Sequence, residues 1–196
     1  MKRIVILALV LAAAGLPVTG CGSAGRTTLA VESAPDAPAA STPAADHNGK
    51  DVMFAQMMIP HHRQAVEMAK LAEGRAASDQ VKELAGKIEA AQEPEIRTMS
   101  GWLTAWGAQV PGERGMPMDH DMPGMMSGQA MEELKGLKGA AFDRAFLTMM
   151  IQHHEGAVAM AGQEQAEGVH EPARRMAADI VAGQSAEIAT MRRLLR

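Results

Sequence analysis

The sequence predicts an all-α protein, a four-helix bundle built from two duplicated helical hairpins. Core-facing residues recur at three- and four-residue spacing through several long segments, as in amphipathic helices. One stretch of the chain occurs twice, 92 residues apart. A single amphipathic hairpin leaves its apolar stripe uncovered, whereas two hairpins can bury theirs against each other. With 196 residues, 47% of them hydrophobic, one compact domain is expected.

Residues 1–20 are expected to be an export signal. Two basic residues precede a short apolar run, and residues 18–21, Val-Thr-Gly-Cys, resemble a bacterial lipobox. The run is too short for a membrane-spanning helix. Cys21, the only cysteine of the chain, would then carry a lipid anchor to the membrane. The protein is expected to be exported and held on the outer side of the bacterial cytoplasmic membrane, or in the periplasm. A plain secretory signal is the alternative.

Residues 21–48 are rich in Ala, Pro, Ser and Thr and have few large apolar residues. Such a segment cannot bury enough surface to offset its ordering entropy, so it is expected to be a flexible tether. His47 at its end is expected to be solvated. The net charge of the chain is −4, which argues against nucleic-acid binding and favours cations.

The bundle domain is expected over residues 49–196, with its first hairpin over residues 51–103. The stripe of the first helix is formed by Phe54, Met57, Met58, His61, Ala65, Met68 and Ala72. Asp51 and Gly74 are expected near the ends of this helix, and Pro60 predicts a kink within it. The second helix is expected from about residue 79 to residue 106.

The second hairpin is expected over residues 143–195. Aligned with the first at an offset of 92, it has 20 identical residues among 53 positions without a gap. The identity extends past the histidines into the second helix, so the whole hairpin is duplicated. Residues 107–137 connect the two hairpins and are expected to hold a short helix near residues 127–135.

Each hairpin carries a pair of adjacent histidines in its first helix. Neighbouring helical residues point about 100° apart, so such a pair cannot grip one ion from the same side. Each histidine instead has a methionine one turn earlier: Met57 with His61, Met58 with His62, Met149 with His153 and Met150 with His154. Imidazole and thioether ligands suit Cu(I) far better than Mg²⁺, Ca²⁺ or Mn²⁺. Core filling is the alternative for the methionines.

Buried histidines need polar partners, and the second helix of each hairpin offers them. Gln92 and Gln184 fall on otherwise apolar stripes, which indicates a polar layer shared with the histidines. Glu95 and Glu187 are expected either to hold a histidine in one tautomer or to be solvated; the sequence leaves both open.

The connection between the hairpins contains a second group of soft ligands. Two prolines and a glycine oppose helix formation there, and an extended chain would place alternate side chains on one face. The candidate metal ligands of this segment are Met116, Met118, His120, Met122, Met125 and Met126. Exposed methionine gains nothing as core filling, so metal binding is favoured over partner docking or incidental composition.

The motif Met57-Met58-Ile59-Pro60-His61-His62, its copy from residue 149 and the Pro-Gly-Met-Met between them resemble the family of domain of unknown function 305, the CopM-like ferritin-like proteins. The resemblance covers nearly all of residues 51–195. It implies an exported protein with a ferritin-like four-helix bundle. Some members of the family are implicated in copper binding and copper resistance. Neither histidine doublet is part of the Glu-x-x-His pattern that di-iron ferritin-like enzymes use.

The resulting expectation is a membrane-anchored protein without enzymatic activity that binds copper, with Cu(I) favoured. It would sequester the ion or exchange it with a donor or acceptor protein. Two alternatives stay open: a ferritin-like di-metal redox enzyme, which needs a bridging carboxylate such as Glu95 or Glu187, and a metal-free bundle that is structural or binds a partner.

Overall fold

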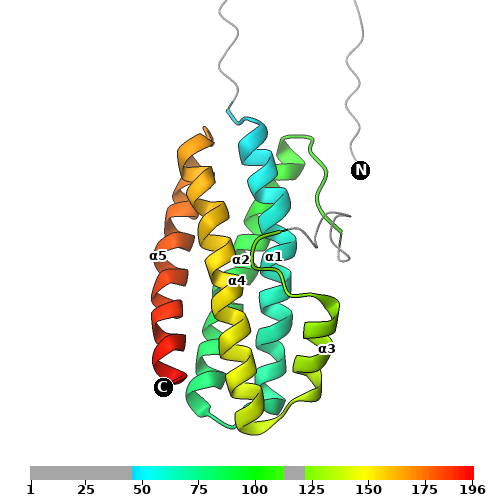
Figure 1. The fold of residues 1–196 in the computed structure, drawn as a ribbon. Coiled ribbons are helices and arrows are strands. Elements are labelled where there is room, and N and C mark those ends of the chain that lie inside the picture. The colour runs from blue at the N-terminus through cyan, green and yellow to red at the C-terminus, as the bar shows by residue number, and fades with distance from the viewer. Residues whose placement is uncertain (1–45, 113–121) are drawn as a thin grey trace, which may run out of the picture. The chain divides into compact units, whose positions relative to one another are not determined.

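Four long helices make up the body of the protein in the computed structural model, which describes residues 46–112 and 122–196 (Figure 1). Helices α1 (Gly49–Arg75) and α2 (Asp79–Ala105) form one hairpin, and α4 (Gly139–Glu167) and α5 (Glu171–Leu194) form the other. The short helix α3 (Gly128–Gly136) lies beside α1 and α4. The predicted all-α four-helix bundle is confirmed. No helix in the described ranges is long and apolar enough to cross a membrane.

The first helix begins earlier than its apolar stripe indicates. Asn48 is its N-cap and accepts from the backbone N–H of Asp51, while the Asp51 carboxylate accepts from the N–H of Asn48. This capping box satisfies donors that a helix end otherwise leaves unpaired. Pro60 lies inside α1, which continues to Arg75, one residue past Gly74. Ser127 caps α3 through its side chain, where a short helix was expected.

The two hairpins meet mainly where α1 lies along α4, whereas α2 and α5 touch only sparsely. The core between them consists of two apolar clusters. The α3-side cluster includes Met68, Leu84, Ile88, Leu134, Phe142, Phe146, Met150 and Met191. The tryptophan-side cluster includes Phe54, Met58, Ile59, Met99, Leu103, Met160 and Ile180, with Trp102 and Trp106 packed against it. Each long helix contributes to both clusters, and its stripe is interrupted by polar residues where it passes from one to the other.

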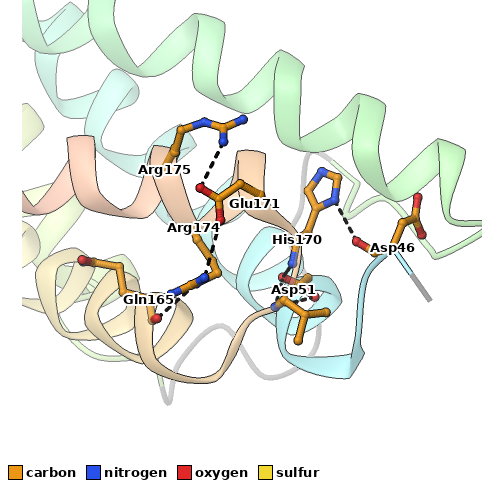
Figure 2. A network of polar contacts seen from close by, with 8 residues as sticks. Asp46, Asp51, Gln165, His170, Glu171, Arg174 and Arg175 are labelled. Carbon is orange, nitrogen blue, oxygen red and sulfur yellow. Dashed lines mark hydrogen bonds and ion pairs between the residues drawn. The ribbon is translucent and has the colours of Figure 1, made fainter. Parts of the chain in front are cut away.

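An aspartate at the start of each hairpin fastens the turn of the other hairpin. Asp51 Oδ1 accepts from the backbone N–H groups of Val169 and His170, at 3.1 and 2.9 Å (Figure 2). Asp143, its equivalent in the repeat, accepts from the N–H groups of Ala77 and Ser78, at 3.1 and 2.9 Å. The acceptor and both donors are equivalent in the two copies. The duplication therefore includes the contact that joins the hairpins.

Candidate metal centre

A layer of polar side chains crosses the middle of the bundle, between the two apolar clusters. Helices α1 and α4 each supply two histidines, and α2 and α5 each supply a glutamine and a glutamate. The four histidines and both glutamines are buried. We call this set the histidine layer: His61, His62, Gln92, Glu95, His153, His154, Gln184 and Glu187.

The outer histidine of each doublet is held by a carboxylate from the second helix of its own hairpin. His62 Nε2 lies 2.7 Å from Glu95 Oε2, and His154 Nε2 lies 2.6 Å from Glu187 Oε2. Both imidazoles are fully buried, while the two glutamate side chains remain 24% and 23% exposed. A carboxylate partner fixes the orientation and tautomer of a ring, so each histidine points its other nitrogen, Nδ1, away from the carboxylate.

The inner histidines of the two doublets meet each other. The rings of His61 and His153 lie 3.7 Å apart between centroids, at an interplanar angle of 36°. Because these residues are equivalent in the repeat, the approximate two-fold axis of the bundle passes between them. The environment of the pair is asymmetric, since His61 Nε2 lies 3.1 Å from the carbonyl oxygen of Pro123.

Both inner histidines are neutral near neutral pH. Burial, with the neighbouring His62 as the next contributor, lowers the pKa of His61 to about 3. Burial also holds the pKa of His153 well below its usual value, with His61 as the next contributor. Neutral imidazole is the form that binds metals, so no proton has to be displaced from these rings at neutral pH.

Many polar atoms of the histidine layer have no hydrogen-bond partner among the residues that the structure describes. They are Nδ1 of His61, His62 and His154, both ring nitrogens of His153, both amide atoms of Gln92, and Oε1 of Gln184. Buried polar groups normally have partners, and a concentration of exceptions calls for a water or an ion. The layer therefore has donor atoms to spare for a metal.

A metal in this layer would have either fewer than three His, Cys, Asp or Glu ligands or additional ligands of another kind, such as thioethers. Within residues 46–112 and 122–196, no three His, Cys, Asp or Glu side chains lie close enough to hold a metal together. Sites for Zn²⁺, Mg²⁺ or Ca²⁺ generally need more such ligands than this. Soft Cu(I) accepts imidazole and thioether ligands, so the donor set fits it better.

The end of the Met-rich connection covers the inner histidine pair. The side-chain amide of Gln64 on α1 donates a hydrogen bond to the carbonyl oxygen of Met126 and accepts one from the N–H of Met126. On α4, a Cβ on Gly156 would lie 2.0 Å from the carbonyl oxygen of Pro123, so only glycine allows this approach. Gly124 has φ +79°, a backbone conformation that favours glycine. Gln64 and Gly156 are equivalent in the repeat yet differ, which explains why the connection covers one side of the bundle.

The methionines of the two motifs lie in different surroundings. Met58 is fully buried in the tryptophan-side cluster and Met150 in the α3-side cluster, on opposite sides of the histidine layer. Met57 and Met149 are half-buried. In the connection, Met122 and Met126 are buried and Met125 is half-buried. Met116, Met118, His120 and Cys21 lie outside the described residues.

The sequence did not point to two groups that the structure places near these sites. Repetition does not identify Gln64 and Gly156, because these equivalent positions carry different residues. That difference is itself the signal of an asymmetric contact. Glu164 was also missed; it is buried on α4, where the first repeat has Ala72. Burial and the neighbouring Asp51 carboxylate raise the pKa of Glu164 to about 8.

Asp51, the neighbour of Glu164, is an ionised acid. Burial alone would raise its pKa, but the backbone N–H bonds from Asn48, His170 and Val169 lower it below its ordinary value overall. Figure 2 shows the bonds between Asp51 and the turn at Val169 and His170, and the His170 side chain pointing to the Asp46 carbonyl oxygen. His47, expected to be solvated, stacks on Trp106 with ring centroids 4.6 Å apart.

Several solved structures are similar to this chain. A predicted secreted DUF305 protein from Streptomyces coelicolor is 35% identical with a TM-score of 0.67, over 78% of this chain and 94% of that chain. A DUF305 fragment from Deinococcus radiodurans is 35% identical with a TM-score of 0.68, over 76% and 96%. CopM in its Cu(II)-bound form is 35% identical with a TM-score of 0.65, over 74% and 95%.

The sequence comparison agrees with the structural one. No protein with a curated function matches the chain. The family described as Domain of unknown function (DUF305) matches residues 51–195, which span both hairpins and the connection between them. The chain therefore belongs to the DUF305 family.

Proposed function

We propose that this protein binds copper outside the cytoplasm, with Cu(I) the favoured state, and either sequesters the ion or passes it on. The observation that carries the proposal is the histidine layer. It holds four buried imidazoles with unpartnered nitrogens, two of them neutral, and the apolar clusters on either side of it contain methionines. Burying so many unpaired polar atoms is costly unless a ligand uses them.

The similar structures support copper as the metal. CopM, about a third identical to this chain, has been solved in Cu(II)-bound, Cu(I)-bound and Ag-bound forms. Silver is chemically close to Cu(I) in its preference for soft ligands. A chain of the same family with His-His doublets and 17 methionines has the ligand types for the same metals.

The Met-rich connection would capture the ion and deliver it to the layer. Two of its candidate ligands, Met122 and Met126, are buried where the connection covers the bundle. Pro123 in this segment contacts His61. An ion bound at Met122, next to Pro123, would therefore lie near His61.

Placement at a membrane surface is a further part of the proposal. Cleavage before Cys21 and lipidation of its thiol would leave residues 21–48 as a tether to the bundle. A similar DUF305 protein is described as a predicted secreted protein. At that surface the protein would meet copper in transit and a protein that donates or accepts it.

The two alternatives have less support. A di-metal redox enzyme needs carboxylates shared between metals, whereas Glu95 and Glu187 each bond to a separate histidine. A metal-free structural or partner-binding bundle offers no reason for the unpartnered atoms of the histidine layer.

An anaerobic Cu(I) titration against a competing chelator tests the proposal on the full chain. Three variants locate the ion: His61→Ala with His153→Ala in the layer, a deletion of residues 116–126, and His47→Ala with His170→Ala as a control that removes two histidines outside the layer. We expect the layer variant to lose tightly bound Cu(I) and the control to keep it.

Two results would contradict this assignment. If the intact protein binds no Cu(I) more tightly than the chelator, the copper function is wrong. If only the deletion of residues 116–126 loses copper, the ion belongs to the connection and not to the bundle. Circular dichroism on each variant checks that the helices persist.

A further inference from the structure

A second cluster of soft ligands lies away from the histidine layer, near the start of α1 and the end of α4. It surrounds a cavity of about 30 Å³ lined by Lys50, Met53, Phe54, Met57, Met160 and Glu164, among others. We propose that this cavity is a separate site for a soft monovalent metal ion, held by the thioethers of Met53, Met57 and Met160, with Glu164 as its counter-charge once the ion displaces the carboxyl proton. The proposal relies on the proposed function only for the class of metal.

The ligands come as two matched pairs on facing helices. Met53 and Met57 are four residues apart on α1, and Met160 and Glu164 are four residues apart on α4. Side chains at this spacing lie on one face of a helix, one turn apart. Since α1 lies along α4, the two pairs face one another across the cavity.

Glu164 is the observation that points to a ligand. Its side chain is on a residue only 2% exposed, and neither carboxyl oxygen has a hydrogen-bond partner in the part of the chain that the structure describes. Its carboxyl group lies against Gly168, in space that the Cβ of any other residue there would occupy. A buried carboxyl group without partners is costly, and a bound cation would supply what it lacks.

The charged groups around Glu164 leave it without a cationic partner. Asp51 on α1 adds a second carboxylate, whose oxygens accept backbone N–H groups. Lys50 also lines the cavity, but its ammonium pairs with Glu167. Arg174 on α5 acts on Glu164 by its charge, yet its guanidinium bonds to Gln165 and Glu171. The local balance is negative and favours a cation.

The methionines identify the class of that cation. Met53 is 51% exposed, one of two large apolar side chains so exposed in the described ranges, and it gains little there as core filling. Met57 is half-buried and Met160 is buried. Three thioethers select Cu(I) or Ag(I) over Mg²⁺ and Ca²⁺, which take oxygen ligands. The cavity volume is about that needed for a single water-sized particle.

The repeat supplies an internal comparison. The residues equivalent to Met53, Met57, Met160 and Glu164 are Ala145, Met149, Met68 and Ala72. The other end of the bundle thus keeps two methionines but lacks the exposed methionine and the carboxyl group. Met68 is fully buried there, and Met149 packs against the α3-side cluster. The proposed site exists in one copy, and its equivalent serves as a matched control.

Methyl NMR of the full chain, labelled with ¹³C at the methionine methyl groups and titrated with Ag(I), tests the inference. Silver needs no reductant and does not change oxidation state. We expect the methyl signals of Met53, Met57 and Met160 to shift together and saturate as a single ion binds. The signals of Met68 and Met149 should stay in place during that event.

Variants then connect the signals to the ion. Met53→Leu with Met160→Leu leaves Met57, the partner of His61, in place and should bind one Ag(I) fewer than the wild type. Glu164→Gln should keep the ion but bind it more weakly. Met68→Leu, at the position equivalent to Met160, should bind as many as the wild type. Leucine for methionine preserves volume, so all these proteins should fold.

An unchanged Ag(I) count in the variant Met53→Leu with Met160→Leu would overturn the inference. So would shifts of Met68 and Met149 together with the other three. The result is separable from the proposed function: loss of an ion in His61→Ala with His153→Ala concerns the histidine layer, while the methyl signals of Met53 and Met160 report on this cavity.

Discussion

The imidazoles of His61 and His153 lie 3.7 Å apart between ring centroids, tilted by 36°, and the two residues are equivalent in the repeat. A duplication places equivalent residues around an approximate two-fold axis, and a residue near that axis meets its own copy. One histidine in the ancestral hairpin is therefore enough to give a pair of contacting histidines after duplication. The covering connection then breaks the symmetry, because it contacts His61 through Pro123.

Acid should destabilise the metal-free protein through His61. Burial lowers its pKa from 6.5 to about 3, so the unfolded chain binds a proton that the folded chain excludes. The stability associated with neutral His61 is complete above pH 6.5 and is lost as the pH falls toward 3. We expect a loss on the order of 3 kcal/mol between pH 7 and pH 4. Urea unfolding at both values measures it. His61→Phe should lose less, and equal losses in the two proteins would refute the assignment.

Glu164 should give the opposite dependence on pH. Its pKa is raised from 4.5 to about 8, so the folded protein holds a proton that the unfolded chain releases. The stability contributed by the protonated form is complete below pH 4.5 and is lost as the pH rises through 8. Relative to Glu164→Gln, the wild type should lose on the order of 3 kcal/mol between pH 5 and pH 9. Urea unfolding of chelator-treated protein at several pH values in this range measures the difference. If the free energies of unfolding of the two proteins change with pH in parallel, the raised pKa is wrong.

Replacing Gly156 by alanine should displace the covering segment. A Cβ there would lie 2.0 Å from the carbonyl oxygen of Pro123, so the backbone on one side has to move. We expect destabilisation of about 1 to 3 kcal/mol, as for an overpacked site. Gly162→Ala is the control on the same helix, because its Cβ would meet nothing within 4 Å. That change should stabilise α4 by about 0.5 to 1 kcal/mol. Thermal unfolding of both variants shows whether the signs differ.

Asp143 should contribute to stability through the turn that it holds. Asp143→Ala removes two hydrogen bonds from a carboxylate to the N–H groups of Ala77 and Ser78. We expect a cost of about 1 to 3 kcal/mol in the free energy of unfolding. Asp79→Ala is the control, since that side chain is almost fully exposed and pairs only with Lys82; its cost should stay below about 1 kcal/mol. Similar costs for the two would mean that Asp143 does not fasten the hairpins.

Much of the fold follows from local and repeated features of the sequence. Apolar spacing defines helices because the period of the helix is a property of the backbone, and duplication defines two equivalent hairpins. The histidines and their partners Glu95 and Glu187 were recognised for the same reason, since they recur at one offset. Residues that break the repeat, such as Gln64, Gly156 and Glu164, carry no such signal, although they make the asymmetric contacts.

The sequence by itself determined the four helices, their grouping into hairpins and the polar residues that interrupt each apolar stripe. Only the tertiary structure decided which of those residues meet. Spacing along one helix relates Met57 to His61, whereas packing of α1 against α4 brings His61 to His153 and Met57 to the cavity beside Glu164. The rotation of each helix about its axis sets these contacts, and it depends on how all the side chains of the core fit together.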